Sequence, residues 1–250
     1  MHWAAPRATM RAFLDRISPA MPFFFSPSYL VITLIGMVAM GWAQWRVHSA
    51  YKKYSKIGAR TGMTGAQVAR QLLDSDRLFD VSIEKTPGKL DDHYDPQARV
   101  LRLSEGVHDG SSLASIGVAA HEMGHALQHA EGYAPLSFRQ AFFPVAAFSS
   151  RAWSTLLLIG IILGVTPLGK GLLIAAAIFL AIYALFALVT LPVEYDASRR
   201  ALHLLEGSQT LDDEELVGAR KVLSAAGLTY VASAFQTVLM LVYVVARARQ

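Results

Sequence analysis

The chain has 250 residues, a formal net charge of +4 and no cysteine. Hydrophobic residues make up 53% of it and charged residues 17%, which is more apolar than a wholly soluble domain. Without cysteine there is neither a disulfide nor a thiolate metal ligand, so any metal site must use His, Asp and Glu. The chain has no basic stripe with interleaved aromatic residues, which argues against a nucleic-acid partner.

Residues 1–26 contain several arginines together with Pro19 and Pro22, which predicts an irregular or interfacial lead-in. Residues 27–45 carry no charge and are long enough to cross a bilayer as a helix. This run begins too late for a signal peptide and lacks an obvious cleavage site, so we expect a retained anchor. The basic residues that follow are typical of a segment facing anionic cytoplasmic lipid: Arg46, Lys52, Lys53 and Lys56.

Residues 46–150 form a more polar region, which we expect to hold the catalytic site. Residues 64–73 are predicted to form a helix with Thr64 as its N-cap and an apolar face at every third or fourth position. Residues 81–84 and 100–104 alternate apolar and polar side chains, which predicts two short strands. A small pair of strands therefore precedes the next helix.

The most informative motif is H-E-M-G-H at residues 121–125, within a run of helical composition. Positions four apart lie on one face of a helix, so His121 and His125 can bind the same ion. Glu122 lies beside them, where it can act as a general base. With 8 His in the chain, such a motif is expected by chance only about 0.01 times. Gly124 carries no side chain, which lets a substrate or a second helix approach.

Residues 151–193 are predicted to form a transmembrane hairpin, with spans at 152–168 and 171–193. Residues 194–225 then form a segment with two polar helices, and residues 228–247 form a fourth span. The last span carries Ser233, Gln236 and Thr237, whose polar side chains favour contacts with other helices over lipid. The alternative for the second and fourth spans is a buried core helix.

A zinc ion at the motif needs a third protein ligand. His129 follows His125 by four residues, but each such step overshoots a helical turn by about 40°. His129 therefore lies about 80° from His121, and we expect it to support the site or to lie on the helix surface.

Glu194 and Asp196 are the stronger candidates because a carboxylate at the end of an apolar span is costly unless it is paired or metal-bound. Two residues apart on a helix, they point about 200° away from each other, so we expect only one ligand. The alternative is an ordinary interfacial acid next to Arg199 and Arg200.

Five runs form a specific pattern along the chain, at residues 92–96, 100–105, 116–129, 190–201 and 228–232. In these runs, the chain from Tyr54 onward resembles the bacterial neutral zinc metallopeptidases of the YugP type. A more distant likeness is to the membrane gluzincins, namely the HtpX heat-shock protease and the CAAX prenyl-endoprotease group.

In those gluzincins a glutamate ligand follows a membrane hairpin, and Glu194 falls on that position. Ser198 departs from the pattern, because it stands where the group usually has an aspartate that supports a zinc histidine. Asp196 is the alternative for that role. The resemblance also implies that residues 100–104 form an edge strand that pairs with extended substrate.

These features predict a mainly α-helical, integral membrane, zincin-like (gluzincin) metallopeptidase with about four transmembrane helices and a small β element. We expect one Zn²⁺ bound by His121, His125 and Glu194, with Glu122 as general base. His129 and Asp196 are expected to support these ligands. Four residues are candidates for stabilising the oxyanion: Tyr195, His203, His93 and Arg199.

The expected partners are a lipid bilayer and a peptide or membrane-protein substrate. Basic residues after the first span predict an inner-membrane protein with its catalytic region in the cytoplasm. Two other functions remain open at this point. One is an inactive, zinc-stabilised membrane scaffold, which an intact Glu122 argues against, and the other is a zinc hydrolase with a non-peptide substrate.

Overall fold

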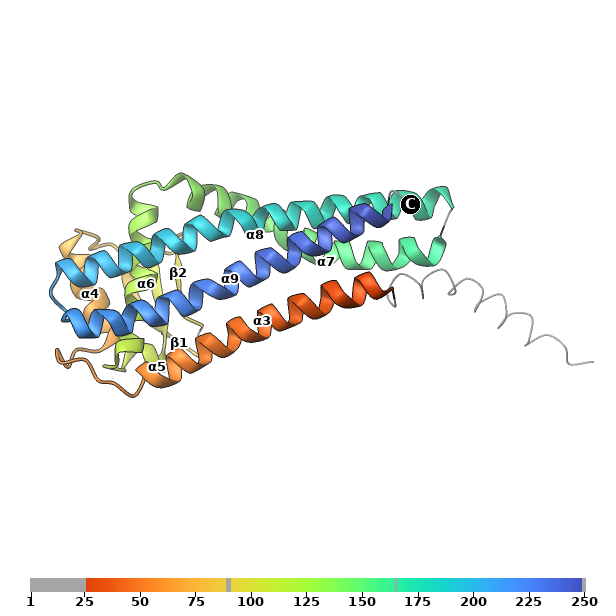
Figure 1. Cartoon of the computed structure of the whole chain (residues 1–250). Coiled ribbons are helices and arrows are strands. Elements are labelled where there is room, and N and C mark those ends of the chain that lie inside the picture. The colour runs from red at the N-terminus through yellow and green to blue at the C-terminus, as the bar shows by residue number, and fades with distance from the viewer. Residues whose placement is uncertain (1–25, 89–90, 165, 249–250) are drawn as a thin grey trace, which may run out of the picture. The chain divides into compact units, whose positions relative to one another are not determined.

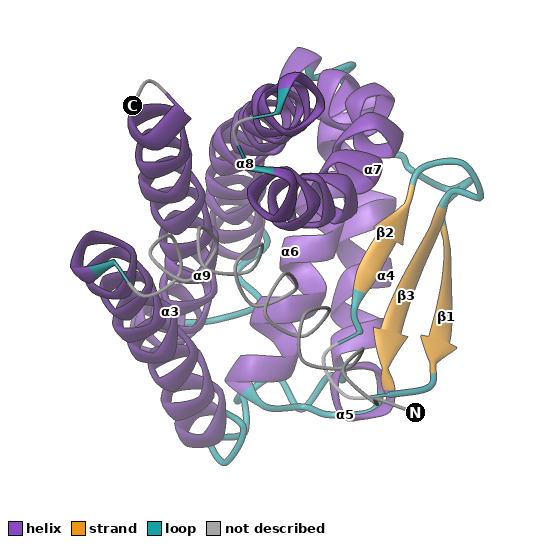
Figure 2. Cartoon of the chain, turned by 90° about the vertical axis from the view of Figure 1, so that its right-hand side faces the viewer, coloured by secondary structure: helices purple, strands orange, loops and turns teal. Residues whose placement is uncertain are grey.

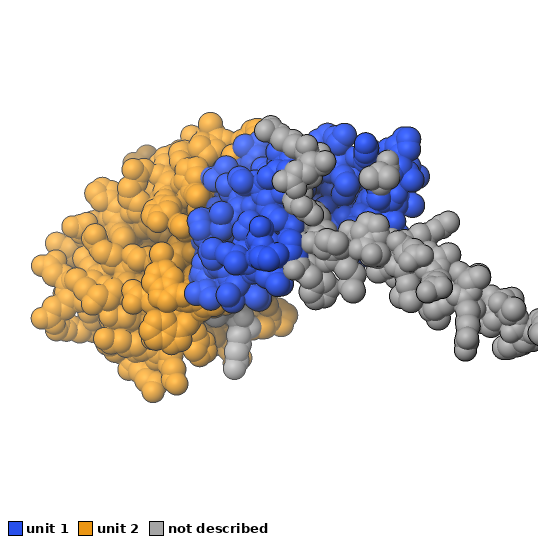
Figure 3. Space-filling model, turned by 45° about the vertical axis from the view of Figure 1, so that its right-hand side comes forward, with its two compact units in different colours: residues 1–40, 141–188, 232–250 blue, residues 41–140, 189–231 orange. Residues whose placement is uncertain are grey.

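The structure is a computed structural model that describes residues 26–248, except for residues 89–90 and 165. Almost all of the expected lead-in at residues 1–26 lies outside this range. The chain divides into two compact units, shown in Figure 3. Unit 1 comprises residues 1–40, 141–188 and 232–250, and unit 2 comprises residues 41–140 and 189–231.

Four long helices contribute residues to both units (Figure 1). All four are long and apolar enough to cross a membrane, which confirms the mainly α fold with four candidate spans. They are α3 (Pro27–Tyr54), α7 (Ala134–Leu163), α8 (Pro167–Gly207) and α9 (Asp213–Ala248).

These helices extend beyond the apolar runs that predicted them. α3 continues nine residues past position 45, and α8 runs through Pro192 without a break. Residues 194–207 are therefore not a separate helix, and α9 includes both the second polar helix and the fourth span. The end of an apolar run marks where a helix leaves apolar surroundings, whereas the helix itself ends only where caps or glycine stop it.

Unit 1 has the composition of a membrane segment. Its described residues include no Asp or Glu, so every described acid lies in unit 2. Large apolar side chains on its surface are exposed, for example Met37 at 61% and Val38 at 63%. Such a surface is stable when lipid covers it. The interior of the unit is apolar as well and includes Leu157, Ile161, Leu180, Met240 and Tyr243.

Unit 2 holds the shorter elements, which Figure 2 shows beside one another. They are α4 (Gly65–Ser75), β1 (Ser82–Thr86), β2 (His93–Asp95), β3 (Val100–Ser104), α5 (Glu105–His108) and α6 (Leu113–Ala130). The predicted N-cap is confirmed, because the Thr64 side chain accepts from the Gln67 backbone N–H in a complete capping box.

The three strands form one sheet in the order β1-β3-β2. β3 pairs with β1 in parallel and with β2 antiparallel, so it is the central strand. The prediction that residues 100–104 form an edge strand is therefore wrong. β2 was not expected, because three residues are too short to show an alternating pattern.

α6 lies at the centre of unit 2 and packs against α4 and the sheet. It is buried around nearly its whole circumference, so even its polar motif residues Glu122 and His125 are buried. The surrounding core is aliphatic and fully buried, which holds α6 in one position. Its larger members are Val68, Leu72, Leu101, Leu103, Ile116 and Met123.

Candidate metal centre

The helix that carries the motif is anchored at its start and packed tightly at its middle. Ser112 caps α6 by accepting from the Ser115 backbone N–H. At Gly124, α8 comes so close that a Cβ atom would lie 2.4 Å from the Ala197 carbonyl oxygen. Gly124 is therefore required for a second helix to pass beside the motif, which is one of the two roles that the sequence predicts for it.

Replacing Gly124 with alanine is expected to push α8 away from α6. Because Glu194 lies one turn before Ala197, the change should separate Glu194 from the two histidines and weaken zinc binding. Overpacking of this kind costs about 1–3 kcal/mol of unfolding free energy. Thermal unfolding and zinc titration would measure both effects. Gly41→Ala is the control, because no atom lies within 4 Å of its added methyl group, and zinc binding by Gly124→Ala equal to wild type would contradict the expectation.

Glu194 of α8 meets both motif histidines. Its Oε2 atom lies 3.2 Å from His121 Nε2 and 3.6 Å from His125 Nε2. Ligand atoms on a tetrahedral zinc, each about 2.0–2.1 Å from the ion, lie roughly 3.3 Å apart. The three donor atoms therefore have the spacing and chemistry of a zinc site with an open fourth position, and all lie within 4.8 Å of one another.

Both histidines have a hydrogen-bond partner on the ring nitrogen that faces away from Glu194. His125 Nδ1 lies 3.0 Å from Gln128 Oε1, and His121 Nδ1 lies 3.2 Å from Ser198 Oγ. With Nδ1–H donating, the Nε2 lone pair is available for a metal. Ser198 thus holds His121 itself, although it lacks the carboxylate usual at that position in the membrane gluzincins.

Asp196 supports the site through Gln128 and lies outside the ligand group. The Gln128 amide donates to Asp196 Oδ2 at 2.9 Å and to the Val193 carbonyl at 2.8 Å. Arg199 and Arg200 form ion pairs with the same carboxylate. Asp196 therefore fixes the amide that orients His125.

The electrostatics of His125 favour a bound cation. Burial lowers the pKa of the His125 imidazole, but its hydrogen bond to Glu194 and the nearby Glu122 and Glu194 carboxylates raise it more, so the net direction is upward. A positive charge at this position is thus stabilised by the surrounding carboxylates. A metal ion that displaces the proton meets the same stabilisation.

Glu122 is held by the short strand that the sequence did not predict. The Tyr94 backbone N–H of β2 donates to Glu122 Oε2 at 3.0 Å. The Tyr94 hydroxyl lies 2.8 Å from His129 Nδ1, so His129 contacts Tyr94 and does not join the ligand group. Because the Tyr94 N–H points to Glu122 of α6 and not to β3, the outer edge of β2 borders Glu122.

Two residues beside Glu194 were not expected from the sequence. Arg139 Nη1 of α7 lies 3.4 Å from Glu194 Oε1, and the side chain of Tyr230 in α9 lies near the Glu194 carboxylate. Each carried a signal in the sequence. Arg139 is the lone charge between Glu131 and Arg151, and Tyr230 falls in one of the runs that resemble the YugP type.

Among the described residues, none of the four expected to stabilise an oxyanion forms a hydrogen bond or an ion pair with the three candidate ligands. His93 is exposed on β2 and contacts the Asp91 carbonyl. His203 follows Glu194 by nine residues, or about 14 Å along the helix axis, which is too far for contact with a reacting carbonyl. Tyr195 and Arg199 are exposed on α8 and, with His203, line an adjacent cavity.

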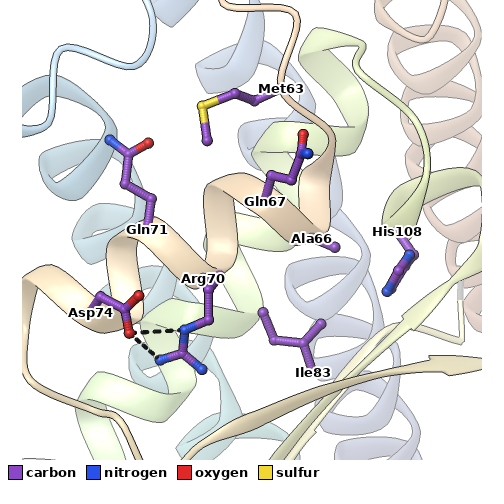
Figure 4. Close-up of a pocket in the computed structure, with 8 residues that line it drawn as sticks. All are labelled: Met63, Ala66, Gln67, Arg70, Gln71, Asp74, Ile83 and His108. Atoms are coloured by element: carbon purple, nitrogen blue, oxygen red, sulfur yellow. Dashed lines mark hydrogen bonds and ion pairs between the residues drawn. The ribbon is translucent and has the colours of Figure 1, made fainter.

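Unit 2 has one cavity beside the candidate metal site and another cavity away from it. One, of about 580 Å³, has Glu194 and Ser198 in its wall. The other, of about 780 Å³, lies at α4 and includes Ile83 and His108 in its lining (Figure 4). In the second hollow Arg70 points to Asp74 and forms an ion pair with it, and none of the motif residues lines it. Of these two hollows, the one with the larger volume is therefore not the one beside the candidate metal ligands.

Comparison with known proteins finds similarity over nearly the whole length of the chain. A family profile described as "Putative neutral zinc metallopeptidase" matches residues 29–249. The "Putative membrane protease YugP" of Bacillus subtilis (strain 168) is 45% identical over 208 residues, which cover 82% of this chain and 90% of that protein. No solved structure matches the chain. The chain belongs to the family of neutral zinc metallopeptidases.

Proposed function

We propose that the protein is a zinc-dependent endopeptidase with His121, His125 and Glu194 as metal ligands. The observation that carries this proposal is the spacing of the three donor atoms, at 3.2 and 3.6 Å between each imidazole and the carboxylate. Ser198 and Gln128 hold the two rings in that orientation. When bound, zinc supplies a Lewis acid that activates water and polarises a carbonyl.

The chain supplies the remaining groups that peptide hydrolysis needs. Glu122 takes the proton of the attacking water and returns it to the leaving amine. The Tyr94 backbone N–H keeps one oxygen of Glu122 in place, which leaves the other for the water. Arg139 and Tyr230 are our candidates for stabilising negative charge on the substrate oxygen, because Arg139 pairs with the Glu194 carboxylate and Tyr230 lies near it.

We further propose that the protein lies in the bacterial inner membrane with unit 2 in the cytoplasm. Basic residues follow the first span at Arg46, Lys52 and Lys53, and positive charge beside a span favours the cytoplasmic side. Reporters fused near residues 90 and 210 should then be active if they are of a type that works only in the cytoplasm, and inactive if they are of a type that works only in the periplasm. Fusions at these positions that are active only in the periplasm would reverse the assignment.

The substrate is expected to be membrane-bound or close to the membrane. Glu194 follows the last unit 1 residue of α8, Leu188, by six residues, or about 9 Å along the helix. A cleavage site near the lipid surface favours substrates that are already held there, because tethering raises their effective concentration.

The measurement compares one peptide sequence in two forms, using protein reconstituted in liposomes with zinc. One form is free in solution, and the other is attached to a transmembrane helix in the same liposome. We expect at least about tenfold faster cleavage of the tethered form at equal bulk concentration. Equal rates would show that the membrane does not present the substrate, whereas cleavage of neither form would count against the peptidase itself.

A further inference from the structure

The 580 Å³ cavity shares a wall with the proposed metal site. Glu194 and Ser198 line it, and Ser198 is the residue that contacts His121. The rest of its lining comes from α3, α8 and α9, all within unit 2. A ligand in this cavity would therefore touch the residues that hold the metal.

The charged side chains of this cavity are mostly basic. Arg46, Arg220 and Lys221 line it and are exposed, and none of the three belongs to an ion pair within the part of the chain that the structure describes. Arg199 also lines it but is already paired with Asp196. Besides the proposed ligand Glu194, the lining contains one acid, Glu206. The wall thus offers three uncommitted cations against one free carboxylate.

We propose that this cavity binds carboxylate groups of the substrate, so that the enzyme prefers peptides with acidic residues several positions away from the bond that is cleaved. The proposal rests on the proposed peptidase function and adds the substrate class. Basic side chains without an ion-pair partner attract the anionic groups of a ligand. Exposed acidic residues elsewhere on the chain neutralise their charge only weakly, because water screens the interaction. Tyr195, Leu202 and Leu228 also line the cavity, and their apolar surface suits the carbon chains of peptide residues.

A lipid phosphate is the other anion that basic residues near a membrane attract. We favour a peptide because the cavity wall includes Glu194 and Ser198, so a lipid headgroup lodged there would obstruct the metal site. A peptide lying across that wall would instead bring its backbone to the site and its acidic side chains to Arg220 and Lys221.

Binding, without turnover, provides the first test. The Glu122→Gln protein loaded with zinc is mixed with fluorescent peptides in zwitterionic detergent, and their affinity is measured by anisotropy. One peptide carries Glu on both sides of its centre, and its partner carries Gln at the same positions. Each is made with a free and with an amidated C-terminus, which separates side-chain carboxylates from the terminal one.

The Glu peptide is expected to bind about five- to tenfold more tightly than the Gln peptide, because exposed ion pairs each change affinity about two- to fivefold. Raising the salt concentration to about 1 M should remove most of that difference, because the screening length then falls to about 3 Å. Arg220→Gln/Lys221→Gln should remove it at low salt. Lys52→Gln/Lys56→Gln is the matched control, since it removes the same charge from exposed residues outside the cavity and should retain the preference.

Three results of the peptide-binding measurement would each overturn the proposal. They are equal affinity for the Glu and Gln peptides, a preference that survives Arg220→Gln/Lys221→Gln, and a preference lost equally in the Lys52/Lys56 control. If anionic lipid displaced both peptides equally well, the cavity would be a binding site for lipid headgroups, and this result would also overturn the proposal. Cleavage by otherwise wild-type protein without an acidic preference rejects this inference alone, whereas zinc-independent cleavage rejects the proposed function.

Discussion

The Glu122→Gln protein is expected to bind one zinc ion per chain and to lose nearly all peptide cleavage. Glu122 is not among the three donor atoms that group around the site, so the ligand set survives the change. Glutamine keeps the size of the side chain and can still meet the Tyr94 backbone, but it cannot accept a proton from water. Loss of a general base lowers the rate about 100- to 10,000-fold.

Metal analysis and proteolysis on the same purified sample would measure both properties. Tyr230→Phe is a useful comparison, because it removes only the hydroxyl beside Glu194. We expect it to keep zinc and to lower kcat by about 100- to 1,000-fold if that hydroxyl stabilises the oxyanion. Full activity of Glu122→Gln would reject the mechanism, and zinc binding without any cleavage by wild type would favour a scaffold or a non-peptide substrate.

The Glu194→Ala protein is expected to lose zinc. This substitution removes a carboxylate that lies close to both imidazole Nε2 atoms and leaves two proposed ligands where a stable catalytic site uses three. It also leaves Arg139 without its nearby acid, so some loss of stability should accompany the loss of metal. Zinc affinity measured against a competing chelator, together with thermal unfolding, would separate the two effects.

Asp196→Ala and His129→Ala are the controls, because neither residue belongs to the proposed ligand group and each acts on the site only through other residues. Asp196 contacts Gln128, which holds His125, and His129 contacts Tyr94, which holds Glu122. Loss of such a supporting contact costs about 10- to 100-fold in metal affinity, less than loss of a ligand. If Asp196→Ala were the metal-free variant and Glu194→Ala retained zinc, our choice of ligand would be incorrect.

Local features of the chain were predictable because they depend on residues that are close in sequence. His121 and His125 share a helix face through their spacing of four, and Thr64 caps α4 through contacts with Gln67 three residues later. β3 has the predicted bounds, because its alternating pattern is five residues long. The apolar runs also indicated four membrane helices, although not their ends, since a helix continues when its surroundings change from lipid to water.

Contacts across long stretches of sequence were decided only by tertiary packing. β3 is the central strand only because β2 pairs with it, and β2 is too short to be recognised in the sequence. The sequence therefore could not show that β2 is the edge strand beside Glu122. Arg139 and Tyr230 reach Glu194 from two other helices, and no spacing rule connects them.

The sequence by itself indicated the chemistry that we propose for this protein, through a two-histidine motif with an adjacent glutamate and a carboxylate after an apolar span. The tertiary structure decided which groups surround that carboxylate and where the adjacent basic cavity opens. The physical reason is that side-chain type and helical spacing are properties of the local chain, whereas partners of a buried charge are set by how separate helices pack. Gly124 connects the local sequence with the tertiary packing. Because it has no side chain, α8 can pass close to α6 and bring Glu194 to the two histidines.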